Sequence, residues 1–344
     1  MPTSESLRAA VVGASGFVGG ELLRLLSGHP RVGALRAFSE SGVGKTWAEV
    51  HPALTHVAAG RFEAGDPVAV RSWADVTFLA LPHGRSQLLA GEFLDTAPRL
   101  VVDMSADFRI ADRGLYEAAY GPHAAFEQVQ GFTYGLADRL GEALAGKARI
   151  ATPGCFATAA LLALWPFAGR LAAPASVFAV TGSSGAGVEP RRTTHHPVRA
   201  HSFFAYSLAG HRHEAEIVCQ LRGWGCGQPC RLIAHAAPLV RGIHATAHLR
   251  LVEPVPQPGL LLAEVYAGRP FVRVLERPPE LAAVVGTNFA HLHAVPRDGG
   301  REVLVTVAID NLVKGAAGQA VQAANLALSL GETAGLTFPG LYPC

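Results

Sequence analysis

A single cysteine stands between a Pro-Gly turn and a long apolar run in the stretch ATPGCFATAALLALWP, residues 151–166. The apolar run predicts a helix that begins at about Cys155. The first N–H groups of a helix have no partner within the helix, and the positive end of the helix dipole lies there. Both effects favour a thiolate over a thiol. The pattern therefore indicates a nucleophile, and the alternative is a small buried hydrophobic residue.

Two histidines flank an arginine in the stretch SLAGHRHEAEI, where His211, Arg212 and His213 precede a helical pattern. An ordinary histidine pKa lies near 6.5. A histidine beside a thiolate can therefore hold it as an ion pair and can transfer a proton during turnover. We expect one of the two histidines to be the acid/base partner of Cys155. The alternative is a cluster on the protein surface.

Glycines recur with a spacing of three in LRAAVVGASGFVGGELLRLL, between an apolar strand and an apolar helix. Glycine allows a tight turn and a close backbone approach, and the helix N-terminus attracts a pyrophosphate. The stretch predicts a dinucleotide-binding βα unit. The residues expected to hold the cofactor there are Gly13, Ala14, Ser15, Gly16, Phe17 and Val18.

The choice between NAD and NADP is left open by the residues that follow the second expected strand. Glu40 lies where an acidic residue would take the ribose 2′-hydroxyl of NAD. In the same loop, Ser39, Ser41 and Lys45 offer hydroxyl and ammonium groups that suit the 2′-phosphate of NADP.

Other polar groups follow predicted strands or turns. Arg109 ends the stretch DMSADFR, and its planar guanidinium suits a phosphate, a carboxylate or a salt bridge between domains. The stretch SSGAG, residues 183–187, is either a turn or a group of anion-binding N–H groups. His195 and His196 are adjacent and lack further metal ligands nearby, so we expect a loop feature near the site and no bound metal.

The composition excludes several classes of protein. The chain has 344 residues, which favours two domains, and only 16% of them are charged against 49% hydrophobic, which favours a homo-oligomer, dimer or tetramer. A net charge of +2 without a basic block argues against nucleic acid. No apolar run is long enough for a membrane span, and the opening residues do not form a signal peptide. Together with five scattered cysteines, this predicts a cytoplasmic protein.

The expected fold class is α/β. Apolar segments that end in the loops of ADVTFLALPHG and RLVVDMSADFR are typical of buried parallel strands, so residues 1–153 are predicted to form a Rossmann domain. From about residue 230 the segments alternate, which indicates a mostly antiparallel α+β domain over residues 154–314. A final helical segment, within about residues 315–344, is expected to rejoin the first domain.

Eight stretches, in this order, resemble the N-acetyl-γ-glutamyl-phosphate reductase family, which is related to aspartate-semialdehyde dehydrogenase. They cover nearly the whole chain: VGASGFVGGELLRLLSGHP, FLALPHG, SADFR, PGCFATAALLAL, GSSGAG, GHRHEAEI, RGI and AIDNLVKGAAGQAVQAANLAL.

The resemblance implies a Rossmann domain, an α+β domain of the semialdehyde-dehydrogenase type that carries the oligomer interface, and NADPH as reductant. It implies Cys155 as nucleophile and His211, in preference to His213, as acid/base. It also implies contacts with the substrate or its phosphate, or with the cofactor, for a further set of residues: Arg109, Arg241 and Ser183 on the substrate, and Ser39, Ser41, Gly185 and Asn311 on the cofactor.

The resemblance also implies the reaction. The Cys155 thiolate attacks an acyl phosphate, phosphate leaves, and the thioester is reduced to a semialdehyde in arginine biosynthesis. Val188 and Glu189 depart from the family's common arginine-pathway pattern. The stretch RRTTHHPVR after them is more similar to lysine-pathway reductases, whose aminoadipyl-phosphate substrate is attached to a small acidic carrier protein. Arg191, Arg192 and Arg199 are candidates to contact such a carrier. A catalytically inactive nucleotide sensor is the alternative from another class.

Overall fold

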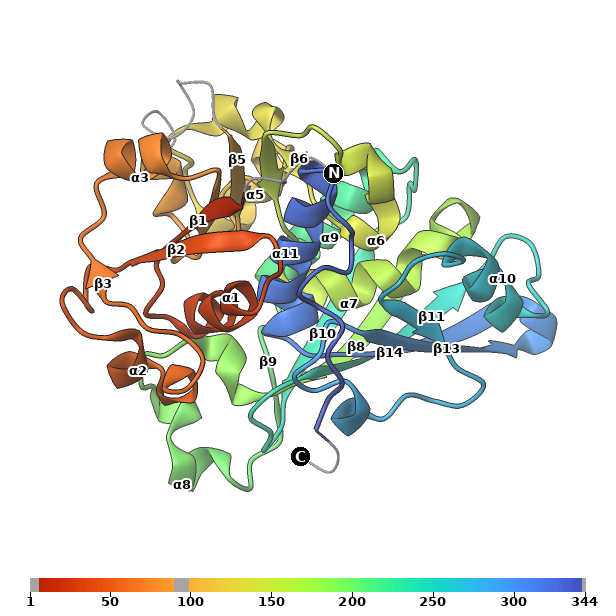
Figure 1. Ribbon diagram of the computed structural model, residues 1–344. Coiled ribbons are helices and arrows are strands. Elements are labelled where there is room, and N and C mark those ends of the chain that lie inside the picture. Colours follow the sequence, from red (N-terminus) through yellow and green to blue (C-terminus); the bar gives the residue numbers. More distant parts are fainter. Residues whose placement is uncertain (1–5, 90–98, 342–344) are drawn as a thin grey trace. The chain divides into compact units, whose positions relative to one another are not determined.

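The computed structural model describes residues 6–89 and 99–341 and divides into two compact units (Figure 1). Unit 1 comprises Met1–Arg109, His123–Pro153 and Ala316–Phe338, and unit 2 comprises Ile110–Pro122, Gly154–Gly315 and Pro339–Cys344. The expected domain boundary at residues 153 and 154 falls where the chain passes from unit 1 to unit 2. The sequence analysis did not anticipate the assignment of residues 110–122 to unit 2. The parts of the expected domains at residues 1–5, 90–98 and 342–344 lie outside the described residues.

Unit 1 contains a fully parallel sheet with the strand order β3-β2-β1-β4-β5-β7-β6. The side chains of β4 and β5 are buried throughout, as expected of central strands covered on both faces. This confirms the predicted α/β fold class. The strands are β1 (Leu7–Val12), β2 (Val32–Phe38), β3 (Phe62–Glu63), β4 (Val76–Leu79), β5 (Leu100–Asp103), β6 (Thr133–Tyr134) and β7 (Arg149–Ala151).

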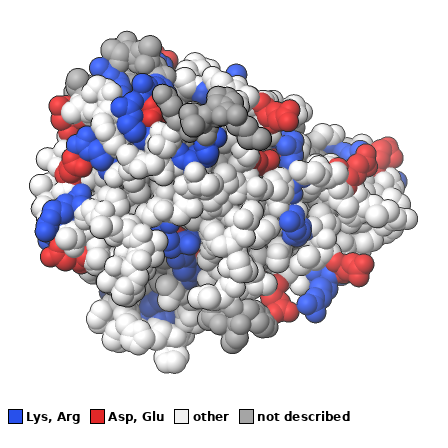
Figure 2. All heavy atoms as spheres, viewed as in Figure 1, with Lys and Arg blue, Asp and Glu red and all other residues white. Residues whose placement is uncertain are grey.

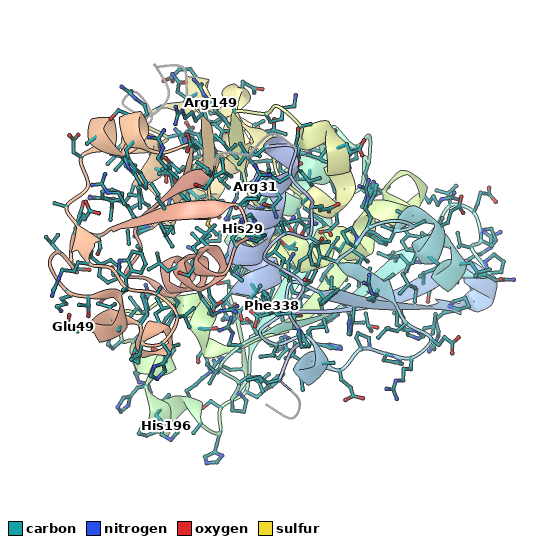
Figure 3. All side chains as sticks on the ribbon, viewed as in Figure 1. His29, Arg31, Glu49, Arg149, His196 and Phe338 are labelled. Carbon is teal, nitrogen blue, oxygen red and sulfur yellow. The ribbon has the colours of Figure 1, made fainter. Side chains whose placement is uncertain are left out.

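The helices of unit 1 include one from the far end of the chain. They are α1 (Phe17–Ser27), α2 (Trp47–Val50), α3 (Pro67–Trp73), α6 (Ala137–Leu140) and α11 (Gly318–Ala327). Figure 1 shows α11 in blue beside α1 in red, and the two helices are in contact. The buried side chains of His29, labelled in Figure 3, and Asn325 are joined by a hydrogen bond of 3.0 Å between Nε2 and Oδ1. The C-terminal helix therefore completes the packing of the first unit.

Unit 2 contains a mixed sheet with the strand order β12-β13-β14-β11-β8-β10-β9. The pairs β8 with β10 and β12 with β13 are parallel, and the other neighbours are antiparallel. The sheet is therefore mostly antiparallel, as the alternating segments predict. The strands are β8 (Ala175–Thr181), β9 (Phe204–Tyr206), β10 (Cys230–Ala236), β11 (Ile243–Arg250), β12 (Val272–Val274), β13 (Ala290–Arg297) and β14 (Glu302–Ile309).

The two faces of this second sheet differ. Helices pack on one face, where every second side chain of β8, β10 and β11 is buried. Side chains on the opposite face are half-buried or exposed, and Phe178 is 50% exposed there. A sheet with one face not covered by helices is a surface that a partner can cover. The helices of unit 2 are α5 (Arg113–Tyr120), α7 (Cys155–Leu164), α8 (His196–Arg199), α9 (Arg212–Gly223) and α10 (Pro258–Val265).

A buried carboxylate organises the turn after β14. Asp310 is fully buried, and its two oxygens accept hydrogen bonds from the Arg241 guanidinium and from the backbone N–H groups of Gly286, Leu312 and Val313. These bonds fix the start of a π-helix at Val313–Ala317. Such single π turns often occur at functional sites.

The surface charge is mixed. Figure 2 shows Lys and Arg interspersed with Asp and Glu on the face in view. Among the described residues, no helix is both long and apolar enough to cross a membrane, and no group of three His, Cys, Asp or Glu side chains is arranged to hold a metal ion.

Candidate active site

Cys155 is the first residue of α7, and Gly154 is the N-cap in an extended conformation. The cysteine is partly exposed, and it lines a cavity of about 870 Å³ that lies wholly within unit 2. The first N–H groups of α7 surround this position, and no side chain caps them. The predicted helix start is therefore confirmed, and the thiol stands where a helix N-terminus favours the thiolate.

Two further contacts fix the start of α7. The backbone N–H of Gly154 donates to the fully buried Glu216 carboxylate over 2.9 Å. Gly315, in the π-helix, packs against Cys155 so closely that a Cβ added at Gly315 would lie 2.7 Å from the Cβ of Cys155. The sequence analysis quoted both residues within motifs but assigned them no role. Only glycine fits between the π-helix and the nucleophile.

Aromatic contacts place the two histidines beside Phe156, and both histidines line the cavity of Cys155. The ring of Phe156, the residue after Cys155, lies 5.2 Å from the ring of His211 and 6.0 Å from that of His213, measured between centroids. The two histidine rings are 5.0 Å apart, and Tyr206 packs edge-on against His211 at 5.6 Å. The sequence analysis named His211 and His213 as candidates. It missed Tyr206, since nothing in the stretch FFAYS marks that tyrosine.

His211 has a defined protonation state. Its Nδ1 accepts a hydrogen bond of 3.1 Å from the backbone N–H of His213, which makes His211 the N-cap of α9. Burial, and then the charge of Arg212, lower the pKa of His211 to about 4. The ring is therefore neutral at pH 7 and carries its proton on Nε2. This changes the sequence-based interpretation, because a neutral ring cannot form the expected ion pair with the thiolate.

Tyr206 is also neutral. Burial, and then the charge of Cys155, raise the pKa of the Tyr206 phenol above its ordinary value. Tyr206 and Cys155 line the same cavity. The phenol is thus a hydrogen-bonding group of the cavity and stays protonated throughout the physiological pH range.

The glycine-rich loop after β8 borders the same cavity. Ser183 and Gly185 line it, and their expected contacts with a substrate and a cofactor stay predictions. Asn311 is almost fully buried, donates to the Ser184 hydroxyl over 3.0 Å and accepts from the Gly242 N–H over 2.6 Å. Asn311 therefore positions this loop, and its expected contact with the nicotinamide stays a prediction.

The two arginines predicted for the substrate have defined partners. Arg241 pairs with Asp310 in a two-pronged contact of 2.9 and 3.2 Å. Arg109, in unit 1, is 8% exposed and donates to the carbonyl oxygens of Thr152 and Met104, each over 2.7 Å. Thr152 precedes the Pro-Gly turn, so Arg109 anchors the strand that leads to the nucleophile. Phosphate binding by Arg109 stays a prediction.

The predicted dinucleotide turn forms in unit 1 between β1 and α1. Gly13 has a φ of +81°, and a Cβ there would lie 2.4 Å from the carbonyl oxygen of Ala80. A Cβ on Gly19 would lie 2.5 Å from the Cα of Ala14, so α1 packs directly on the turn. Gly16 is the N-cap and no side chain caps the first N–H groups of α1. A turn of this kind fits a pyrophosphate.

Beside this turn, three serines form a hydroxyl cluster. The Ser15 hydroxyl lies 2.7 Å from that of Ser39 and 3.2 Å from that of Ser41. Glu40 is exposed and forms an ion pair of 2.8 Å with Arg85. Because Arg85 pairs with Glu40, the loop repels a phosphate less than its sequence alone suggests. The sequence analysis missed Arg85, which lies 45 residues further along the chain.

The histidine pair near the cavity is exposed. His195 and His196 lie on the surface, and Figure 3 shows the His196 side chain directed outward from α8.

Comparisons with known proteins cover both units. Residues 8–145 match the family model described as semialdehyde dehydrogenase, NAD binding domain, and residues 155–311 match semialdehyde dehydrogenase, dimerisation domain. The N-acetyl-gamma-glutamyl-phosphate reductase of Desulforudis audaxviator is 41% identical, over 98% of this chain and 100% of that protein. The LysW-L-2-aminoadipate 6-phosphate reductase of Deinococcus radiodurans is 39% identical, over 99% of both.

A solved structure shares the fold. Aspartate semialdehyde dehydrogenase II from Vibrio cholerae superposes with a TM-score of 0.71 at 18% identity, over 94% of this chain and 98% of that one. Together with the two matched domain models and the full-length relatives, this shows that the chain belongs to the semialdehyde dehydrogenase family, in the branch of the N-acetyl-γ-glutamyl-phosphate reductases and their aminoadipyl-phosphate counterparts.

Proposed function

We propose that this protein reduces N-acetyl-γ-glutamyl phosphate to N-acetylglutamate semialdehyde and phosphate, with NADPH as reductant. The observation that carries the proposal is the partly exposed Cys155 at the N-terminus of α7, in a cavity with His211, His213 and Tyr206. A nucleotide sensor has no use for a nucleophile in such a position.

In the first step, the Cys155 thiolate attacks the acyl carbon, and the bond between that carbon and the phosphate oxygen breaks. A thioester forms and inorganic phosphate leaves with the electron pair. Because His211 is neutral, the thiolate is stabilised by the first N–H groups of α7, which Glu216 and Gly315 hold in place. The resemblance assigns the departing phosphate to Arg109.

The second step needs an oxyanion to be stabilised. NADPH, when bound, supplies the hydride that converts the thioester to the oxyanion of a thiohemiacetal. The Nε2–H of His211 is available to donate to this oxygen, because Nδ1 is already engaged by the His213 N–H. Collapse of the oxyanion expels the thiolate and releases the aldehyde, and no proton transfer is required. His211 therefore acts as a neutral hydrogen-bond donor.

The preference for NADP over NAD rests on the loop after β2. The hydroxyls of Ser39 and Ser41 contact that of Ser15, and the guanidinium of Arg85 pairs with Glu40 in the same loop. Hydroxyl and guanidinium groups are suitable ligands for a 2′-phosphate.

A second candidate substrate is the carrier-linked aminoadipyl phosphate of the lysine pathway. Two observations favour it: the relative from Deinococcus radiodurans, at an identity close to that of the arginine-pathway relatives, and two exposed arginines, Arg191 and Arg192, of which Arg191 lines the cavity. Exposed guanidiniums at a cavity mouth suit an acidic carrier protein.

We also propose that two copies associate through the open face of the sheet in unit 2. The face is formed by alternate residues of β8, β10, β11, β13 and β14, and the matched family model over residues 155–311 is described as a dimerisation domain. Among the described residues, Cys155, Cys219, Cys226 and Cys230 are not joined by disulfide bonds, which suits the reducing cytoplasm.

The function is tested in the reverse direction, with N-acetylglutamate semialdehyde, NADP⁺ and phosphate. We expect phosphate-dependent formation of NADPH, and Cys155→Ser should lower kcat by more than about 10³-fold while NADPH still binds. The carrier-bound aminoadipate semialdehyde, assayed beside it, decides between the two substrates. Undiminished turnover by the serine variant would eliminate the thioester route.

The close packing of Gly315 predicts that Gly315→Ala displaces the nucleophile. A shift of about 1 Å can cost on the order of 10²-fold in rate, so we expect kcat to fall by about that factor. The matched control is Gly169→Ala, since a Cβ at Gly169 meets no atom within 4 Å. Equal kcat values for the two alanine variants would show that the contact is unimportant.

The variant His211→Asn separates the two roles of this histidine. Asparagine is a good N-cap, so α9 should keep its start, but the Nε2–H donor is lost. We expect kcat to fall by about 10²–10³-fold with a melting temperature close to that of the wild type at pH 7.5. A steep change of wild-type kcat near pH 6.5 would instead identify His211 as a proton-transfer group.

The lowered pKa of His211 also predicts a pH effect on stability. In the unfolded chain His211 binds a proton below about pH 6.5, whereas in the folded protein it does so only below about pH 4. Stability is therefore present above pH 6.5 and is lost as the pH falls towards 4, by on the order of 3 kcal/mol. Burial raises the pKa of Asp103 to about 6, which changes stability with pH in the opposite direction, but this effect is the same in the wild type and in the variant His211→Asn. Denaturant titrations should thus show a smaller loss for His211→Asn than for the wild type.

The open sheet face predicts that Phe178→Asp weakens self-association. The wild type should sediment as a multiple of the 36.0 kDa chain, and the variant should shift towards the single chain. Leu260, which is 65% exposed on α10 and therefore away from the open face, supplies the control variant Leu260→Asp. A wild type of 36.0 kDa would contradict the proposed association.

A further inference from the structure

Arg199, the last residue of α8, is a buried arginine that borders the cavity of Cys155. It is only 8% exposed, although arginine is rarely buried without a partner. Its Nη2 donates to the carbonyl oxygen of Thr181 over 3.2 Å, and its guanidinium lies 5.7 Å from the ring centroid of Phe204. Its Nε has no acceptor. In the described part of the chain, no carboxylate pairs with Arg199.

The other arginines of the cavity are different. Arg222 pairs with Asp112 at 3.3 Å and Arg231 with Glu214 at 3.4 Å, and both arginines are exposed. Arg191 and Arg212 also line the cavity, and both are exposed. Arg241, which is not part of the cavity lining, pairs with the buried Asp310. A guanidinium that is exposed to water or paired with a carboxylate needs no further anion.

An unpaired buried charge is costly, because the protein interior replaces water without returning its hydrogen bonds. Burial lowers the pKa of Arg199, which is the direction expected when the charged form lacks a counterion. An arginine nevertheless stays protonated in proteins. The site is therefore incomplete until an anion arrives, and the planar guanidinium of Arg199, which lines the cavity, suits a carboxylate.

The neighbours of Arg199 tie this anion to the reaction. Thr181, which accepts from Arg199, is the last residue of β8 and leads into the loop with Ser183. Tyr206 feels the charge of Arg199 and also that of Cys155. The guanidinium, the phenol and the nucleophile all line one cavity.

We propose that Arg199 binds the carboxylate of the substrate, at the end remote from the acyl phosphate, and so selects acidic acyl phosphates. This inference rests on the proposed function. The substrate brings two anionic groups. Phosphate leaves after the first step and has to reach solvent, which does not suit a nearly buried arginine. The carboxylate remains until the aldehyde is released, and it keeps Arg199 paired throughout.

The proposal also separates residues that the sequence analysis grouped. Arg191, Arg192 and Arg199 were all candidates for contact with a carrier protein. The first two are exposed and can meet a protein surface. Burial excludes Arg199 from that role and assigns it to the small-molecule part of the substrate.

The test uses the reverse reaction with full-length protein and measures the KM of each substrate separately. Arg199→Gln should raise the KM for N-acetylglutamate semialdehyde on the order of 10²-fold and leave the KM for phosphate within about threefold. Arg199→Lys should have a smaller effect on the same KM. Arg222→Gln, an exposed arginine of the same cavity, should leave both values within about twofold.

A second arm changes the substrate and needs no variant. In one analogue, the carboxylate of the semialdehyde is replaced by a primary amide. With the wild type, the KM of this analogue should be raised by the same factor as the KM of the carboxylate compound is raised by Arg199→Gln. The glutamine variant should have nearly the same KM for the two compounds.

A raised KM for phosphate alone would make Arg199 a phosphate ligand and overturn the proposal, as would a wild type that is indifferent to the amide. A wild type that is inactive with both N-acetylglutamate semialdehyde and the carrier-bound aminoadipate semialdehyde would overturn the proposed function itself. Protection of Cys155 from iodoacetamide by N-acetylglutamate provides a readout without turnover. The protection should be present in the wild type and lost in Arg199→Gln.

Discussion

The contact between the start of α7 and its surroundings is the constraint on which the site depends. A thiolate needs a fixed positive field, and here the field comes from backbone N–H groups rather than from a charged side chain. Those groups are useful only if the first turn of α7 stays in place. Glu216 holds the N–H of Gly154, and Gly315 closes the space beside Cys155. The π turn that carries Gly315 is in turn held by Asp310, so a buried carboxylate at the end of β14 indirectly positions the nucleophile.

The parts of the site that the sequence predicts are those with local causes. The turn at Gly13 is such a case, because a positive φ and a close approach to Ala80 admit only glycine, and both leave a trace in the residue type. Cys155 is another, since a Pro-Gly pair before an apolar run marks a helix start within a few residues. The predicted strands of unit 1 follow from uninterrupted apolar segments, which need no knowledge of their neighbours.

The remaining parts depend on contacts between distant segments, and no local pattern announces those. Tyr206 meets His211 because β9 and the start of α9 lie together, and the pair Arg85 with Glu40 joins two loops of unit 1. The lowered pKa of His211 likewise has causes that the sequence does not show. A histidine's ordinary pKa is a property of the exposed side chain, whereas burial and the role of helix cap belong to the folded environment. The resemblance to a family supplied roles for the motif residues, but for Arg199 it suggested only a contact with a carrier protein, because the burial of this side chain is not visible in the sequence.

The protonation states in the cavity form a consistent chemical picture. A cationic histidine would stabilise the thiolate as an ion pair, but it would also weaken its attack on an acyl phosphate. The neutral ring of His211 leaves the nucleophile less restrained and still offers an Nε2–H to the oxyanion. Tyr206 is likewise a neutral donor. Hydride addition followed by loss of the thiolate moves no proton at the reacting carbon, so groups with pKa values near 7 are not needed there. Among the described arginines that line the cavity, Arg199 alone is buried, and no carboxylate pairs with it; this gives the site a reason to admit an anionic substrate before any chemistry occurs.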